Sequence, residues 1–154
     1  MLAAAAYVAC RELGVPKTLH DIAIASNIKR KVLSKEYRLL VTELDLTVLV
    51  VEPTKCIAKV ANQSNISEKT KRKALTIMRL IVTKELSAGK NPMGFAASII
   101  YLASLYTGEK KNQAQIANAA GVTEVTLRHR YSDLKRTLGL DSSSLSIDSD
   151  KLSI

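Results

Sequence analysis

The chain has 154 residues, enough for one domain or two small ones, with the hydrophobic and charged content of an ordinary soluble globular protein. Its formal net charge of +9 indicates a polyanionic partner, nucleic acid ahead of an anionic membrane surface or an acidic protein. The longest apolar run, residues 1–10, is too short to span a bilayer and lacks the flanks of a secretory signal. We therefore expect an intracellular protein of the cytoplasm or nucleoid, without a membrane partner.

The first predicted helix, residues 2–12, is apolar nearly all round, which is typical of a helix in the middle of a bundle. A short helix follows a cap at Thr18, with Asp21 three residues on, and a longer helix covers about residues 31–45. Residues 1–45 thus form a first helical unit. In the linker, residues 46–52, the apolar composition favours an extended packed connector over a lone strand.

Residues 53–138 predict five more helices. The first covers residues 53–62, and the second runs from a Ser67 cap to about residue 86, with Ala74, Met78, Ile81 and Val82 facing inward. Residues 92–106 form another all-apolar helix, which begins with Asn91 as cap and Pro92 in the first turn. A short helix capped by Asn112 with Gln115 and a longer helix, residues 123–138, complete the unit. The Ser/Asp-rich tail, residues 139–154, is expected to be disordered.

The chain matches itself without a gap at a shift of about 94 residues. The matched positions are mostly apolar or turn residues, among them Tyr7 with Tyr101, Gly14 with Gly108, Ala23 with Ala117, Leu33 with Leu127, and Tyr37 with Tyr131. The shared unit is the apolar helix, the short helix and the longer helix. The fold class is therefore all-α, with two tandem repeats: the first contains only the last three helices, and the second contains all five.

Residues 112–138 have the pattern of a helix-turn-helix, with Gly121 suited to the tight turn. Helical spacing places Val125 almost opposite the apolar stripe of the last helix, with Arg128 one turn further on. Valine suits a thymine methyl and arginine suits a guanine edge. Thr123, Thr126 and Arg130 are candidates for phosphate contacts. The alternative is a solvated helix face with one stray valine.

The corresponding helix of the first repeat carries a different set of cations. Arg30, Lys31, Lys35 and Arg38 are expected to form a basic docking surface rather than to read bases. A charged, solvated face explains the same residues equally well.

Catalytic and metal-binding motifs are missing from the sequence. Cys10 and Cys56 lie in Ala/Val-rich helical segments, so we expect both to be small buried residues in a reducing compartment. Together with His20 and His129 they are too widely spaced for a zinc site. There is no Gly-rich phosphate loop and no nucleophile with a base at workable spacing. We expect no enzyme, no metal and no cofactor.

Several stretches resemble archaeal transcription initiation factor B and its eukaryotic counterpart, transcription factor IIB. They are residues 7–18 (YVACRELGVPKT), 37–40 (YRLL), 67–70 (SEKT) and 119–126 (AAGVTEVT). The resemblance covers nearly all of residues 2–138. It implies two cyclin-like repeats that clamp the TATA-binding protein on promoter DNA and help recruit RNA polymerase.

The resemblance also assigns residue roles. It implies that Val125 and Arg128 read a purine-rich promoter element, that Arg30 and Lys31 take part in protein docking, and that residues 89–91, with Lys90 and Asn91, contact phosphate. The family's zinc ribbon, its reader segment and the first two helices of repeat one have no counterpart here. We therefore expect a fragment or a truncated chain, with impaired polymerase docking and an unstable or self-associating first repeat. The alternative function is a cyclin-like protein-interaction module that does not read DNA sequence.

Overall fold

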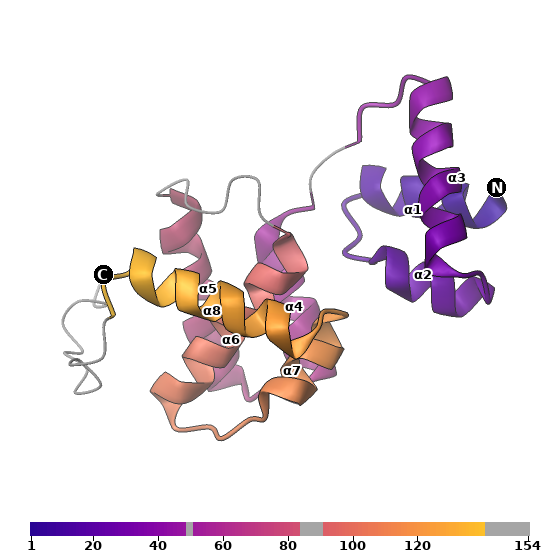
Figure 1. Ribbon diagram of the computed structural model, residues 1–154. Coiled ribbons are helices and arrows are strands. Elements are labelled where there is room, and N and C mark those ends of the chain that lie inside the picture. Colours follow the sequence, from indigo (N-terminus) through magenta and orange to yellow (C-terminus); the bar gives the residue numbers. More distant parts are fainter. Residues whose placement is uncertain (49–50, 84–90, 141–154) are drawn as a thin grey trace.

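The computed structural model describes residues 1–48, 51–83 and 91–140 (Figure 1). Within these ranges every regular element is an α-helix, as predicted. The helices are α1 (Leu2–Glu12), α2 (Leu19–Ser26), α3 (Arg30–Glu43), α4 (Pro53–Gln63), α5 (Glu68–Thr83), α6 (Pro92–Thr107), α7 (Gln113–Ala120) and α8 (Glu124–Thr137).

The helices form two lobes, α1 to α3 and α4 to α8 (Figure 1). In the larger lobe α6 is central and contacts α4, α5, α7 and α8. Eleven of its residues are buried, which explains why this helix has no polar face. In the smaller lobe α1 takes the equivalent place, but of the helices that the structure describes it contacts only α2 and α3.

The internal repeat is confirmed in three dimensions. Tyr7 of α1 meets Tyr37 of α3 edge-to-face with ring centroids 5.0 Å apart, and the equivalent pair in α6 and α8, Tyr101 and Tyr131, meets at 5.1 Å. Leu33 and its counterpart Leu127 are both fully buried. One register therefore positions the same aromatic and aliphatic contacts in both lobes.

The predicted helix caps are also present. The Thr18 hydroxyl accepts from the Asp21 amide at 3.1 Å while the Asp21 carboxylate accepts from the Thr18 amide at 2.7 Å. Thr70 N–H donates to Ser67 Oγ at 3.3 Å at the start of α5. Asn112 caps α7 through the Ala114 amide, without the reciprocal bond expected from Gln115. Each bond satisfies an amide that the helix itself leaves unpaired.

The two lobes differ sharply in how well they cover their apolar residues. The core of the smaller lobe consists of Ala4, Ala23 and Leu33, with partly buried neighbours. Of the eleven exposed large hydrophobic residues in the described ranges, eight lie in the first 44 residues, including Leu2 at 87% and Leu13 at 76% exposure. The smaller lobe thus lacks cover on the side of α1 that α4 and α5 occupy on α6.

A few expectations were wrong in detail. Val82 is exposed at 41% because it lies at the edge of the α5 stripe, and Ile77 fills the inward position instead. Cys56 is buried as expected, but Cys10 is only partly buried, on a helix that packs against two of the described helices. The expected end of α5 near residue 86, part of the linker and the tail beyond residue 140 lie outside the described residues.

Candidate nucleic-acid interface

The connection between α7 and α8 has the geometry of a helix-turn-helix. Gly121 ends α7 with a φ of +64°, and the Val122 amide donates to the Ala117 carbonyl at 3.0 Å. Thr123 then begins α8, its hydroxyl oxygen accepting from the Thr126 amide at 3.2 Å. Caps on both sides of a short connection hold the two helices in a fixed relative orientation.

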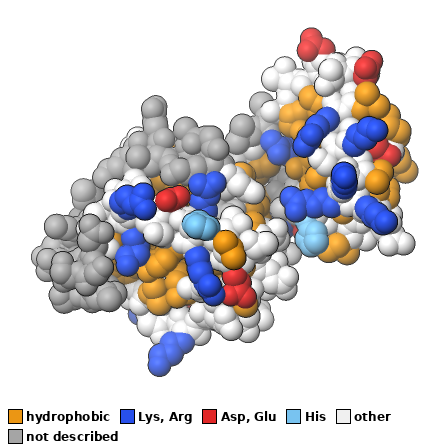
Figure 2. All heavy atoms as spheres, viewed as in Figure 1, with side chains coloured by type: hydrophobic (Ala, Val, Ile, Leu, Met, Phe, Trp, Pro, Cys, Tyr) orange, Lys and Arg blue, Asp and Glu red, His pale blue; other side chains and the backbone are white. Residues whose placement is uncertain are grey.

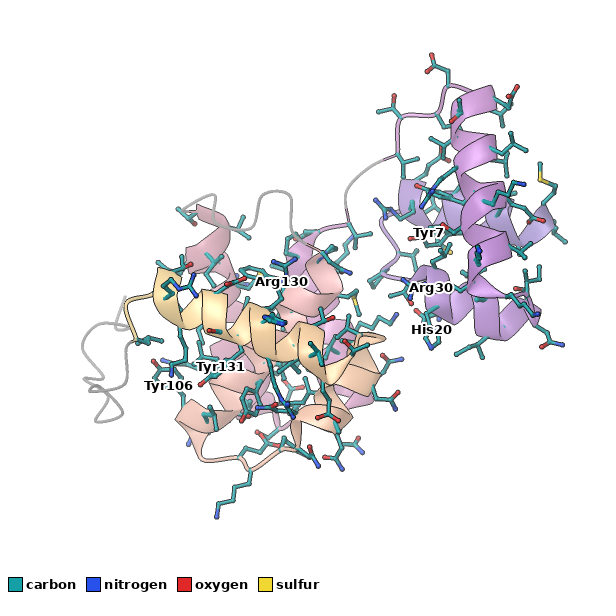
Figure 3. The ribbon with its side chains drawn as sticks, viewed as in Figure 1. Tyr7, His20, Arg30, Tyr106, Arg130 and Tyr131 are labelled. Atoms are coloured by element: carbon teal, nitrogen blue, oxygen red, sulfur yellow. The ribbon has the colours of Figure 1, made fainter. Side chains whose placement is uncertain are left out.

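The inner side of α8 is anchored on α6. Leu127 and Leu134 are buried, and Tyr131 points toward α6 (Figure 3). At the start of α8, a Cβ added to Gly94 of α6 would lie 3.4 Å from the Thr126 methyl group. The glycine therefore lets the two helices approach closely, and this leaves the opposite side of α8 facing solvent.

The outward side of α8 presents Val125 and Arg128. Val125 is 59% exposed, and it is the one large hydrophobic residue of α8 that faces solvent to that extent. The Arg128 side chain is 63% exposed and donates from Nε to Gln113 Oε1 at 3.0 Å and from Nη2 to Glu124 Oε2 at 3.2 Å. These bonds use two of the five guanidinium N–H groups and fix the direction of the side chain.

The other predicted residues of α8 are partly engaged with one another. The hydroxyl oxygens of Thr123 and Thr126 lie 2.9 Å apart, so one hydroxyl donates a hydrogen bond to the other. The second hydroxyl proton can be donated to a ligand. Arg130 lies 3.7 Å from Asp133 and its side chain is one-third exposed. Both threonines lie at the start of α8, and Arg130 lies on the side of the helix close to the buried leucines.

Asn91 lies at the start of α6. Its Oδ1 accepts from the amides of Met93 at 3.0 Å and Gly94 at 3.4 Å, so its side-chain role is to cap the helix. The residue is exposed, and its NH₂ group remains able to donate to a ligand. Lys90, expected beside it, lies outside the described residues.

The first lobe brings its four predicted docking residues together. Arg30, Lys31, Lys35 and Arg38 are all exposed on α3, where with Ser34 they line an open groove of about 740 Å³. Glu36, on the same helix, binds the Met1 ammonium group at 2.6 Å and does not line the groove. The groove is therefore strongly positive.

The family model for the transcription factor TFIIB repeat matches residues 1–43 and 46–137. The chain belongs to the TFIIB repeat family. The two matched segments coincide with the two lobes of Figure 1, each of which is therefore a TFIIB repeat.

Relatives of this TFIIB repeat chain are found among archaeal proteins named transcription initiation factor IIB. The protein of Archaeoglobus fulgidus is 39% identical over 141 residues, which is 92% of this chain and 43% of the relative. The protein of Pyrococcus horikoshii is 40% identical over 142 residues, and initiation factor IIB 1 of Thermococcus kodakarensis is 41% identical over 142 residues. Each of these two matches covers 91% of this chain and 47% of the relative. The chain thus spans less than half the length of these relatives.

A cavity of about 220 Å³ lies between the two TFIIB repeats, and sequence reasoning did not predict it. The first repeat contributes Arg11, Lys17, His20 and Arg30 to its wall, and the second contributes the start of α6 and the turn at Gly121. Figure 3 shows His20 and Arg30 on the edge of the first repeat that faces the second. No carboxylate is among the lining residues, so the wall between the repeats is basic.

One ion pair joins the two TFIIB repeats beside this cavity. Lys59 of α4 donates to the carboxylate of Asp21, the same group that caps α2. Burial raises the pKa of Asp21, but hydrogen bonds from Lys59 and Thr18 and the charge of Lys59 outweigh burial and hold it below its usual value. The folded state therefore favours the ionised carboxylate.

Acidification is expected to weaken this contact between the repeats. Because the folded-state pKa of Asp21 is lowered, its stabilisation is present above the usual value of 3.8 and is lost as the pH falls through the folded pKa. Asp21→Asn should therefore lower the free energy of unfolding by about 1 kcal/mol near neutral pH. Near pH 2, where the carboxylate is protonated, the substitution should leave the free energy of unfolding unchanged. Thermal unfolding of both proteins across this pH range measures the difference. The same difference in stability between the two proteins at every pH would contradict an ionised Asp21 as the source of the stabilisation.

Within residues 1–48, 51–83 and 91–140, no group of three His, Cys, Asp or Glu side chains is placed to hold a metal ion. Burial raises the pKa of the Cys56 thiol to about 11, so this cysteine stays protonated at neutral pH. No helix in those ranges has the length and apolar character that crossing a membrane requires.

Proposed function

We propose that this chain acts as the core of a general transcription initiation factor. In this role it binds the complex of the TATA-binding protein with promoter DNA, reads an upstream promoter element through α8, and helps to recruit RNA polymerase. Membership of the TFIIB repeat family and the names of the archaeal relatives support the role. This role consists of binding rather than catalysis, and we place the protein in the nucleoid.

The observation that carries the proposal is the pairing of Val125 and Arg128 on the exposed side of α8. A major groove admits an α-helix whose first turns meet the base edges. Val125 and Arg128 lie in those turns, and both point away from the bundle. The valine offers a contact to a thymine methyl group, and the arginine offers paired N–H donors to a guanine.

The rest of the surface supports a DNA partner. Thr123 and Thr126 lie at the start of α8, Arg130 is partly exposed on the same helix, and Asn91 caps α6 in the same repeat. These residues suit phosphate contacts, which orient the protein on the duplex without specifying sequence. The formal net charge of +9 favours association with any polyanion and makes it dependent on salt.

Gel-shift of promoter DNA with and without an archaeal TATA-binding protein tests the proposal. We expect a complex containing both proteins on promoter DNA, and weaker binding when the sequence upstream of the TATA box is scrambled. A duplex of equal length without a promoter serves as the control. Absence of the three-component complex, together with equal affinity for every duplex, would favour a protein-interaction module that does not read DNA.

A further inference from the structure

The outward side of α3 forms a continuous basic surface, which we call the α3 basic face. It consists of Arg30, Lys31, Lys35 and Arg38 around Ser34, and all four cations are exposed. At 100° per residue, Lys31, Lys35 and Arg38 fall within about 60° of one another, while Glu36 lies far round the helix. Three positive charges thus point in one direction, and Arg30 borders the groove that they line.

These cations have no acidic partner, unlike five other Lys and Arg side chains in the described ranges. Lys59, Lys71, Lys111, Arg128 and Arg130 each form an ion pair with a carboxylate. Within the described ranges, no ion pair or hydrogen bond involves the side chains of the α3 basic face. Glu36, the acidic residue nearest in sequence, is held by the Met1 ammonium group. The charge of this face is therefore available to an external anion.

The α3 basic face occupies the place that the reading face occupies in the second repeat. Asn27 joins α2 to α3 with a φ of +54°, as Gly121 joins α7 to α8 with a φ of +64°. With Leu33 and Leu127 as equivalent buried anchors, Lys31 stands where Val125 stands and Ser34 where Arg128 stands. The first repeat thus keeps the helix-turn-helix geometry but replaces the base-reading pair with residues suited to phosphates.

The two faces also lie on the same side of the molecule. Figure 2 shows Lys and Arg side chains gathered over α3 in one repeat and over α8 in the other, in a single view. The groove on α3 is lined by four cations and a serine, whereas protein interfaces have an apolar centre. A polyanionic backbone matches this surface better than a protein partner does.

We propose that the α3 basic face is a second contact with duplex DNA, which holds backbone phosphates without reading bases while α8 binds the promoter element. This inference rests on the proposed function, because it places both helices on one duplex. Each phosphate contact releases a condensed counterion and adds about 0.9 to the slope of log affinity against log salt. The α3 basic face should therefore contribute to the salt slope and not to sequence preference.

The triple variant Lys31→Gln, Lys35→Gln, Arg38→Gln tests this inference. Its matched control is Lys69→Gln, Arg72→Gln, Arg79→Gln, which removes three exposed cations of α5. Each triple variant lowers the formal net charge from +9 by three. Fluorescence anisotropy with a labelled promoter duplex across a salt series should show the slope reduced by about 2–3 in the α3 variant and by less than about 1 in the control.

Arg128→Ala, measured in parallel, separates this inference from the proposed function. The α3 triple variant should keep its preference for promoter over scrambled duplex. Lys31→Gln, Lys35→Gln and Arg38→Gln, made one at a time, should each lower the salt slope by about 1. An unchanged slope in the α3 variant, with preference lost in Arg128→Ala, overturns this inference alone and leaves an acidic protein surface as the partner of α3. An equal loss of slope in the control also overturns it. Failure of the wild-type chain to bind any duplex overturns both proposals.

Discussion

Hydrogen exchange is expected to be much faster for the amides of α1 than for those of α6, by roughly two orders of magnitude or more in protection factor. The two helices are equivalent in the repeat, but α6 is covered by four helices and α1 by two. Eleven residues of α6 are buried, against Ala4, Tyr7 and Val8 in α1. Less apolar surface is removed from water when α1 packs on its neighbours. Local unfolding of the first repeat therefore costs less free energy than local unfolding of the second.

Two matched core truncations extend this test. Leu33→Ala and Leu127→Ala remove the same fully buried side chain from equivalent places in α3 and α8. Such a truncation costs about 2–5 kcal/mol. We expect Leu127→Ala to lower the protection of α6, and Leu33→Ala to unfold α1 to α3 while α6 stays protected. Equal protection of α1 and α6 in the wild-type chain would show that the first repeat is stable as it stands.

Arg128→Ala is expected to weaken binding to the preferred promoter sequence by about 1–3 kcal/mol, which is roughly 5- to 150-fold, and to relax sequence preference. Arg128 is exposed and held by Gln113 and Glu124 at the start of α8, so its removal subtracts paired donors without opening the core. Anisotropy titrations with promoter and scrambled duplexes measure both effects.

Arg136→Ala provides the matched control for this variant. Arg136 is another exposed arginine of α8, two turns further along the helix and beyond the first turns that meet base edges. Its loss should weaken binding to every duplex by a similar, smaller factor. If Arg128→Ala behaved in the same way as Arg136→Ala, Arg128 would be a phosphate contact and not a reader of bases.

Local and periodic features of this protein were accessible from the sequence. The register that aligned Tyr7 with Tyr101 and Tyr37 with Tyr131 identified two pairs that the structure joins at nearly equal distances. The caps at Thr18 and Asn112 followed from side-chain chemistry, and the exposure of Val125 followed from the helical period.

Contacts between the two repeats were not accessible in this way. Lys59 and Asp21 are 38 residues apart, on helices of different repeats, and no periodicity relates them. The basic cavity beside them was not predictable for the same reason. Its wall combines side chains of the first repeat with the start of α6 and the turn at Gly121 of the second. Such contacts depend on how two folded units meet, which local patterns do not encode.

Selection of binding sites from a randomised duplex pool tests the central claim most directly, because it reads the contribution of each side chain at each base pair. The wild-type chain, Val125→Ala and Arg128→Ala would be selected in parallel, with the TATA-binding protein present. We predict that the wild-type chain enriches a defined element upstream of the TATA box, and that each variant loses preference at its own neighbouring position. Enrichment of the same element by all three proteins would contradict the assignment of α8 as the helix that reads DNA.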